Sequence, residues 1–164
     1  MSIEPRVLVI SGSMGSGKTT VMTEASDILT AAGIAHAAID ADLLGIVHLP
    51  ESSSANLALQ NLAAVWRNYA AAGVTRLLLA SAVESAADRD ALLRAIPGAH
   101  ITICRLRAAV STMQERVRRR EPGMLQQKLV DRVAELEAIL DSTGLAGFSV
   151  ANEDRPVTAV AREI

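Results

Sequence analysis

Short apolar runs alternate with longer segments along the chain, and this alternation predicts strands that alternate with helices. The runs have strand length and are rich in Val, Ile, Leu and Ala, whereas the longer segments carry apolar residues at spacings of three or four. The predicted strands are residues 6–11, 36–40, 74–81, 99–106 and 148–152. The predicted helices are residues 18–32, 55–72, 84–95, 108–120 and 124–140, and a last helix opens at Pro156.

This order of elements is typical of an α/β fold in which a parallel sheet carries helices on both faces. No linker or repeat interrupts the pattern, so residues 1–164 are expected to form a single domain. Ligands of such sheets bind beyond the carboxyl ends of the strands. Polar and charged residues gather at these predicted strand ends, and the strands themselves are almost entirely apolar. The pattern therefore predicts a functional site along one edge of the sheet.

A glycine-rich segment joins the first predicted strand to the first predicted helix. It has the spacing Gly-x-x-x-x-Gly-Lys-Thr of a phosphate-binding loop, a motif that requires a strand before it and a helix after it. Both conditions are predicted here. The alternative is a glycine-rich turn that fits the pattern by chance. The nucleotide-binding residues expected from the motif are Gly12, Ser13, Met14, Gly15, Ser16, Gly17, Lys18, Thr19 and Thr20.

The chemistry of this loop suits a nucleoside triphosphate. Its glycines allow backbone N–H groups to turn inward around phosphate oxygens, at the positive end of the following helix dipole. Lys18 adds a positive charge beside the outer phosphates, and the Thr19 hydroxyl is a ligand for Mg²⁺. The expected cofactors are therefore ATP and Mg²⁺.

Two acidic residues stand at the end of the second predicted strand. Asp42 is the candidate that orients or deprotonates an attacking hydroxyl, and Asp40 is a candidate ligand of the magnesium shell. An ordinary Asp turn, or a cap on a short helix that follows, is the alternative for both residues.

Arginine is concentrated between the fourth strand and the end of the helix that follows it. A planar, always-charged guanidinium suits the oxygens of a transferring phosphoryl group. Residues 116–124 are interpreted as a short lid that brings Arg116 and Arg120 over the phosphates, because Pro122 and Gly123 end the helix there. A solvated basic helix end is the alternative. The arginines in question are Arg105, Arg107, Arg116, Arg118, Arg119 and Arg120.

Few rings are available to stack on a nucleotide base, since aromatic residues make up 2% of the chain. An arginine plane would have to serve instead. The candidates are Arg116 and the loop from Asn152 to Pro156, in which Asn152 and Arg155 are expected to contact the nucleotide. Trp66 and Tyr69 have the spacing of core residues, with a substrate contact as the alternative.

Charge and composition narrow the classes of partner. The net charge of −2 gives no field that would attract nucleic acid or an anionic membrane. No apolar run is long enough to span a bilayer, and no leader is evident, so a cytoplasmic location is expected. The single cysteine, Cys104, is expected to be a buried thiol. The expected partners are a nucleoside triphosphate and a small-molecule acceptor, in a monomer or homodimer.

The order of these parts resembles the small P-loop kinases, among them adenylylsulfate kinase, gluconate kinase and shikimate kinase. The resemblance rests on the phosphate loop, the Ile39-Asp40-Ala41-Asp42 strand end, the arginine-rich lid and the Asn152 loop, and it covers nearly the whole chain. It implies a five-stranded parallel sheet in the order 2-3-1-4-5 and a Mg-ATP donor. By position, Asp42 is similar to the family's hydroxyl-activating carboxylate, and Arg116 and Arg120 are similar to its lid arginines.

Departures from the family patterns leave the acceptor unnamed. Leu43-Leu44-Gly45 stands where adenylylsulfate kinases usually have Asn and Arg, and Ala80-Ser81-Ala82 replaces the glycine triplet of shikimate kinases. The leading hypothesis is an ATP-dependent kinase that acts on a hydroxyl or phosphate of a small molecule. A nucleotide-driven ATPase or switch without an acceptor is the main alternative, and a nucleotide-binding module without catalysis is another.

Overall fold

Five parallel strands lie side by side in the order β2-β3-β1-β4-β5 in a computed structural model, which describes residues 4–48 and 57–164. This order and the α/β class agree with the predicted fold. The central strand, β1, pairs with β3 on one side and with β4 on the other. The strands are β1 (Arg6–Ser11), β2 (Ala37–Asp40), β3 (Arg76–Ala80), β4 (His100–Arg107) and β5 (Phe148–Ala151).

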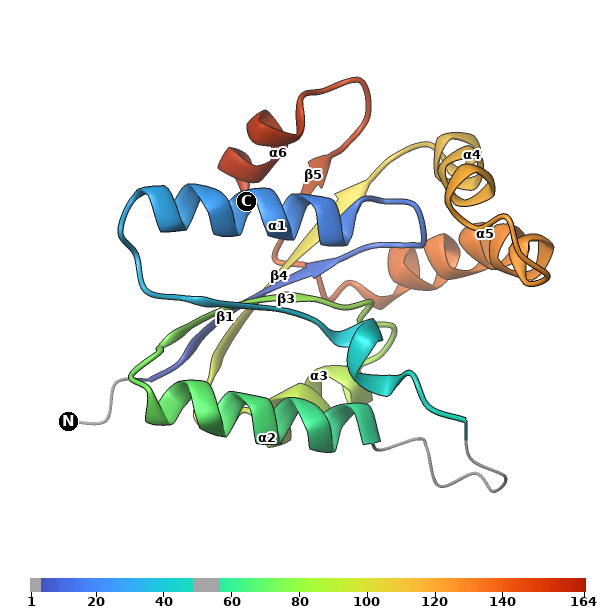
Figure 1. The fold of residues 1–164 in the computed structure, drawn as a ribbon. Coiled ribbons are helices and arrows are strands. Elements are labelled where there is room, and N and C mark those ends of the chain that lie inside the picture. Colours follow the sequence, from blue (N-terminus) through green and yellow to red (C-terminus); the bar gives the residue numbers. More distant parts are fainter. Residues whose placement is uncertain (1–3, 49–56) are drawn as a thin grey trace.

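Helices cover both faces of this sheet, which gives three layers (Figure 1). One face carries α1 (Lys18–Ala31) and α6 (Val157–Glu163), and the other carries α2 (Leu57–Ala71) and α3 (Ala86–Ala95). A pair formed by α4 (Val110–Arg120) and α5 (Gln126–Thr143) extends beyond the carboxyl ends of the strands. Of the helices in the described part of the chain, none is both long and apolar enough to span a bilayer.

Alternation along the strands divides the core between the two faces. On β1, Val7 and Val9 pack with Trp66 under α2 and α3, whereas Ile10 packs with Met22 under α1 and α6. Successive strand residues point to opposite faces, so each apolar strand contributes to both halves of the core. A third cluster, composed of Met113, Val117, Val130 and Val133, joins α4 to α5.

The predictions that two aromatic side chains and the cysteine are buried had different outcomes. Trp66 is 4% exposed, which confirms it as a core residue. Tyr69 is 38% exposed, so its prediction as a core residue is wrong. Tyr69 follows Trp66 by three positions, which places it at the margin of the buried stripe of α2. Cys104 is fully buried as predicted, and this burial raises the pKa of its thiol to about 12.

The segment after β2 differs from the predicted loop. Residues Ala41–Gly45 form a 3-10 turn, η1, whose first backbone groups are capped by the Asp40 carboxylate. The rest of the predicted loop runs to residue 54, and residues 49–56 lie outside the described residues. The same holds for the first two residues of the predicted helix 55–72. At the other end of the chain, Pro156 caps α6 and does not occupy its first turn.

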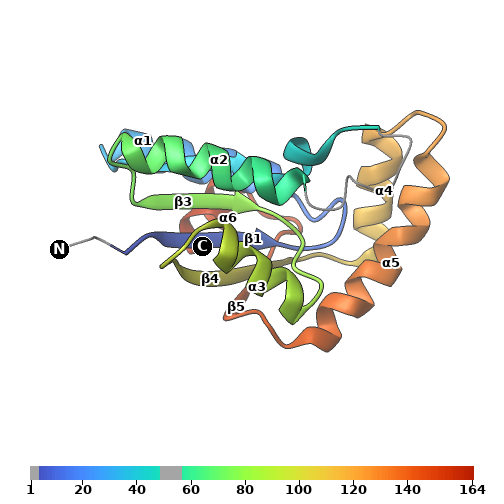
Figure 2. The same cartoon turned by 90° about the horizontal axis from the view of Figure 1, so that it is seen from below.

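The strands are parallel, so their carboxyl ends meet at one edge of the sheet, and in Figure 2 the arrowhead of β3 points toward the end where α4 and α5 lie. The loop that leaves β1, the residues that follow β2 and the turn that leaves β5 therefore lie along one edge of the sheet. This edge is the one that the sequence predicts for the functional site.

Candidate functional site

The glycine-rich loop between β1 and α1 has a backbone that only glycine accommodates. Gly15 and Gly17 have φ angles of 77° and 95°. A β-carbon on Gly15 would lie 2.4 Å from the carbonyl oxygen of Met113, and one on Gly17 would lie 2.3 Å from Asn152 Nδ2. Both contacts are shorter than real carbon contacts allow. These glycines therefore let the loop pass close to α4 and to the turn after β5.

Lys18 folds back along this loop. Its Nζ donates to the carbonyl oxygens of Gly12 at 2.9 Å and Ser13 at 3.2 Å. Burial lowers the pKa of the Lys18 ammonium, while the charges of Asp42 and Asp40 partly oppose this shift. A buried cation with carbonyl partners alone favours an anion as its next neighbour. The ammonium of Lys18 therefore favours binding of an anion, such as a phosphate, at this loop.

Asp40 and Asp42 lie at the mouth of the same loop. Thr19 Oγ1 donates to Asp40 Oδ2 at 2.6 Å, and Asp40 Oδ1 accepts from the backbone N–H of Asp42 at 3.1 Å. Asp40 is therefore a cap, as one reading of the sequence expected, and it also sits against the hydroxyl predicted to bind magnesium. Asp42 lines a cavity of about 80 Å³ with Lys18 and Arg120.

The residues around this cavity fit a polyphosphate and Mg²⁺. Ser16 of the same loop, which does not line the cavity, has a buried hydroxyl with no partner in the described part of the chain, the kind of polar atom that a phosphate oxygen could satisfy. Thr19 and Asp40 would supply the few oxygens that Mg²⁺ takes from proteins. Met14 and Thr20 line the cavity with Thr19. Ser13 is different, because its hydroxyl donates to the Val133 carbonyl of α5 at 2.9 Å.

Arg116 and Asn152 clamp the loop from the opposite side. The Arg116 guanidinium donates to the carbonyl oxygens of Gly15 at 3.2 Å and Asn152 at 3.0 Å. Asn152 Nδ2 donates to the carbonyl oxygen of Ser16 at 2.7 Å. These bonds occupy loop carbonyls and so favour N–H groups on the inner side of the loop. Both predicted nucleotide-binding residues thus touch the loop itself.

Sequence reasoning missed Glu153, which follows Asn152. Its carboxylate accepts from the backbone N–H of Ala109 at 3.1 Å and from the Thr112 hydroxyl, and these bonds lower its pKa. It therefore caps the first turn of α4 and fixes the helix that carries Arg116. Its place directly after a strand end was the only available signal, and the sequence gives no hint of its partner helix.

Two of the six arginines are held by carboxylates of α5. Arg105 is 5% exposed, and its guanidinium donates to Glu137 Oε1 and Asp141 Oδ1, each at 2.7 Å. Arg107 pairs with the same Asp141 at 2.9 Å. These strand-end arginines are held by α5, which differs from the prediction that they contribute to a phosphate-binding cluster.

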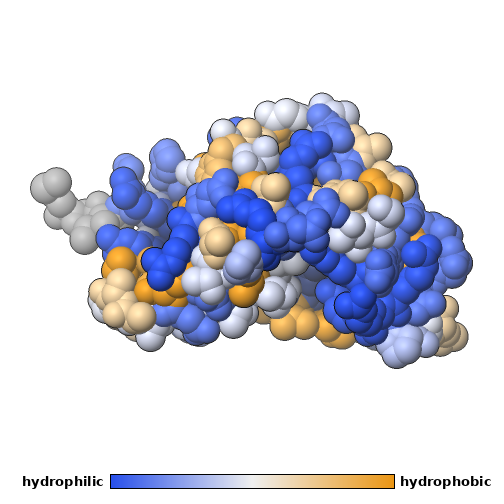
Figure 3. Space-filling view, turned by 90° about the horizontal axis from the view of Figure 1, so that it is seen from above, coloured by the Kyte–Doolittle hydropathy of each residue, from blue (hydrophilic) through white to orange (hydrophobic). Residues whose placement is uncertain are grey.

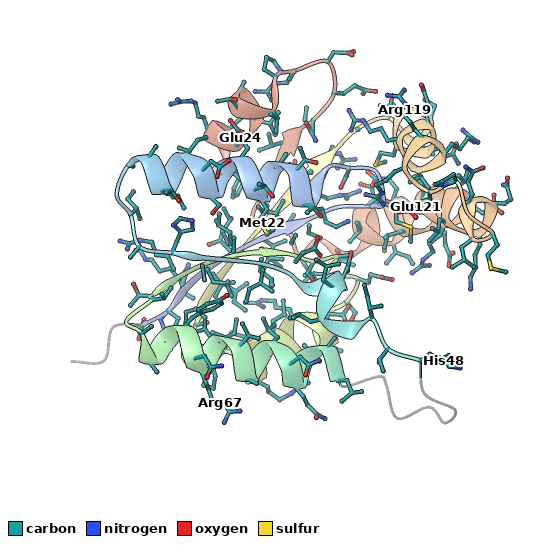
Figure 4. All side chains as sticks on the ribbon, viewed as in Figure 1. Met22, Glu24, His48, Arg67, Arg119 and Glu121 are labelled. Carbon is teal, nitrogen blue, oxygen red and sulfur yellow. The ribbon has the colours of Figure 1, made fainter. Side chains whose placement is uncertain are left out.

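The remaining arginines of α4 point in different directions. Arg119 pairs with Glu115 one turn away and points outward from the helix (Figure 4). Arg120 reaches the cavity and pairs with the neighbouring Glu121. Hydrophilic side chains dominate the end of the molecule that α4 and α5 form (Figure 3).

Arg155, the last predicted nucleotide contact, faces α6. Its guanidinium donates to the carbonyl oxygen of Ala151 at 3.0 Å and to Glu163 Oε2 at 2.5 Å. The turn after β5 thus brings Asn152 to the loop and directs the Arg155 side chain toward the next helix.

A larger hollow of about 660 Å³ opens beside the loop, between Met14 and α5. Its lining is mixed in charge. Arg132 pairs with Glu84 at 2.7 Å, and Glu84 lies in the segment that follows β3. Sequence reasoning did not single out Arg132 as a site residue. The other lining residues are Lys128, Leu129, Asp131 and Glu135.

Solved structures with the same fold include several small-molecule kinases. The gluconokinase of Sinorhizobium meliloti is 20% identical and has a TM-score of 0.63, over 99% of this chain and 90% of that one. The APS kinase of Mycobacterium tuberculosis, solved with AMPPNP and APS, is 20% identical with a TM-score of 0.61, over 99% and 96%. The shikimate kinase of Acinetobacter baumannii, solved with shikimate, is 15% identical with a TM-score of 0.59, over 98% and 90%.

This protein has the fold of the small P-loop kinases. The predicted resemblance is therefore confirmed at the level of the fold. No family model matches the sequence, and no curated protein matches it. Residue roles and substrate therefore depend on this chain's own residues.

Proposed function

We propose that this protein is an ATP-dependent phosphotransferase that acts on a hydroxyl or a phosphate of a small molecule. The observation that supports this proposal best is the joint lining of one cavity by Lys18, Asp42 and Arg120. A cation from the loop, a carboxylate from the neighbouring strand end and an arginine from α4 are the parts that phosphoryl transfer needs. The fold shared with small-molecule kinases supports the same conclusion.

The donor would be held by the loop. Backbone N–H groups of residues 12–17 and the start of α1 bind the phosphates, and Lys18 exchanges its carbonyl partners for phosphate oxygens. Thr19 and Asp40 would hold Mg²⁺, which neutralises charge between the outer phosphates when it is bound. A phosphate beside Lys18 would raise the pKa that burial lowers and so favour the charged ammonium.

The acceptor would approach from the side of β2 and α5. Asp42 would accept a hydrogen bond from an attacking hydroxyl and take its proton as the new bond to phosphorus forms and the bond to the leaving ADP breaks. The hollow next to Met14 supplies room for a small molecule. Its mixed lining, with Arg132 and Asp131 among its residues, suits an acceptor that carries both polar and charged groups.

Residues 116–124 would act as a lid. The tip that follows α4 is open to solvent, and Met124 is 99% exposed. Closure would move Arg120 toward the transferring group and expel water, which strengthens each charge interaction inside.

ATP consumption with and without candidate acceptors tests this proposal. The panel should include gluconate, APS, shikimate and nucleoside monophosphates, each with Mg²⁺. We expect slow turnover alone and at least about tenfold faster turnover with one class of acceptor. Asp42→Asn should remove the acceptor-dependent part, and exposed Arg67→Gln on α2 should not. Equal ATP hydrolysis with and without every acceptor would favour an ATPase or switch.

A further inference from the structure

A further cavity, of about 530 Å³, lies at the amino ends of the strands, at the opposite end of the sheet from the phosphate loop. We call it the amino-edge pocket. In Figure 1 the amino ends of β1 and β3 lie at the opposite end of the sheet from α4 and α5. The volume is within the range of pockets that hold small organic ligands. Its lining residues are Arg6, Val7, Leu8, Leu29, His36, Arg76, Leu77, Leu78, His100, Thr102, Phe148 and Ile164.

Three residues with basic side chains lie next to one another on adjacent strands at one side of this pocket. Arg6 on β1 is in register with Arg76 on β3 and with His100 on β4. Residues in register on neighbouring strands project from the same face, about 4.8 Å apart. Like charges in such pairs destabilise a sheet. Among the residues that the structure describes, no acidic group forms an ion pair with Arg6 or Arg76.

The floor next to this row is apolar. Leu8 and Leu78 follow Arg6 and Arg76 by two positions, so they line the same face of the sheet. Leu29 of α1 and Phe148 of β5 complete the floor, and Phe148 is 36% exposed although it is a large aromatic residue. The pocket therefore joins a partly exposed apolar floor to two arginines that have no ion pair in the described part of the chain.

His36 belongs to the wall of the pocket and is held there by two hydrogen bonds. Its Nδ1 lies 2.8 Å from the carbonyl oxygen of Ile34, and its Nε2 lies 2.7 Å from Ser26 Oγ. A carbonyl only accepts, so Nδ1 donates to Ile34, whereas a serine hydroxyl can either donate or accept. Both ring nitrogens are thus already used.

From this juxtaposition we infer that the amino-edge pocket binds an anionic amphiphile, a carboxylate or phosphate ester with an apolar body. The anionic head would contact Arg6, Arg76 and His100 and relieve the repulsion between the two arginines. The apolar body would cover Leu8, Leu29 and Phe148. This site is separate from the phosphate loop and does not depend on the proposed kinase activity.

Calorimetry on the full chain tests the inference, with decanoate and decyl phosphate as probes below their micelle concentrations. Decanol lacks the anionic head group and tests whether binding needs it. Inorganic phosphate lacks the apolar body and tests whether binding needs that part. We expect one site for the two amphiphiles, and binding at least about tenfold weaker for decanol and for inorganic phosphate. A higher affinity for decyl phosphate than for decanoate would identify a phosphate ester as the preferred class. A higher affinity for decanoate would identify a carboxylate.

Variants locate the site. Arg6→Gln combined with Arg76→Gln should weaken amphiphile binding at least about tenfold, as should Phe148→Ala, while Arg67→Gln leaves it unchanged. Arg67 is a matched control because it points away from α2 into solvent (Figure 4). Thermal unfolding verifies that each variant is folded. If one variant fails to fold, the other alone tests the location of the site. ATP binding should persist in both variants, so failure here is distinguishable from failure of the kinase proposal.

Several results would overturn the inference. These are absence of heat with both amphiphiles, equal binding of decanol, unchanged affinity in folded variants, or competition of decanoate with ATP. The last result would place the amphiphile at the phosphate loop.

Discussion

Arg105 at the end of β4 and Arg120 at the end of α4 belong to the same arginine-rich stretch, and their surroundings are opposite. Arg105 is enclosed by Glu137 and Asp141 of α5, both 2.7 Å from its guanidinium. Arg120 has its side chain 63% exposed and shares a cavity with Lys18 and Asp42. The first arginine joins the sheet to α5, and the second faces the space where a phosphate would bind.

The difference shows that the ion-pair partners of a cationic side chain determine its role. A buried guanidinium that already has two carboxylates gains nothing from phosphate, and breaking its pairs leaves an uncompensated charge. A cation that faces a cavity keeps its charge available to a ligand. We therefore expect substitutions in the α5-held group to act on stability, and substitutions in the cavity group to act on turnover.

Lys18→Ala should give the largest effect, and it falls in the cavity group. Loss of a preorganised charge at the transferring phosphoryl should lower kcat about 1,000-fold, which corresponds to roughly 4 kcal/mol. The free energy of unfolding should fall little, because burial of the ammonium already costs stability. Steady-state kinetics and urea unfolding of the same preparation measure both. Near-normal turnover would refute the assignment of this loop as catalytic.

Arg105→Met should give the largest effect on stability. It leaves Glu137 buried without its partner, so the free energy of unfolding should fall by about 3 kcal/mol. A second change, Glu137→Leu, should recover much of this loss, because a packed apolar pair replaces a buried ion pair at little cost. Chemical denaturation of the single and double variants measures this. An Arg105→Met variant with wild-type stability and reduced nucleotide affinity would reverse the comparison.

Arg120→Gln should lower kcat about tenfold to a hundredfold and leave the unfolding midpoint unchanged. The neighbouring Arg119→Gln is the matched control, because Arg119 pairs with Glu115 away from the cavity. Kinetics with the best acceptor of the panel distinguishes the two variants. Equal losses in both would show that the lid acts through its overall charge.

Asp141→Asn should give the smallest effect, a small loss of stability near neutral pH that disappears in acid. Burial acts to raise the Asp141 pKa, but the hydrogen bond from Arg105 and the charges of Arg105 and Arg107 outweigh it and hold the pKa below 3.8. A lowered pKa means that the carboxylate contributes stability above its unfolded pKa and loses it as the pH falls through the folded pKa. Urea unfolding below about pH 4 should therefore depend less on pH in the variant. Identical pH profiles would contradict this.

Local patterns carried most of what could be predicted from the sequence. The loop motif, the strand periodicity and the gathering of polar residues at strand ends each depend on neighbouring residues, and the fold they predict is the one observed. Pairings between distant residues were not accessible. Arg105 meets Glu137, Arg155 meets Glu163 and Glu153 caps α4, and in each case the partner is fixed only by how the helices pack.

Calorimetric titration of the protein with ATP and Mg²⁺ tests the central claim most directly, since the whole site is built around a loop that binds a triphosphate. We predict binding of one nucleotide per chain in the wild type and at least about tenfold weaker binding in Lys18→Ala. Absence of heat with adenine and guanine triphosphates at millimolar Mg²⁺ would contradict the account.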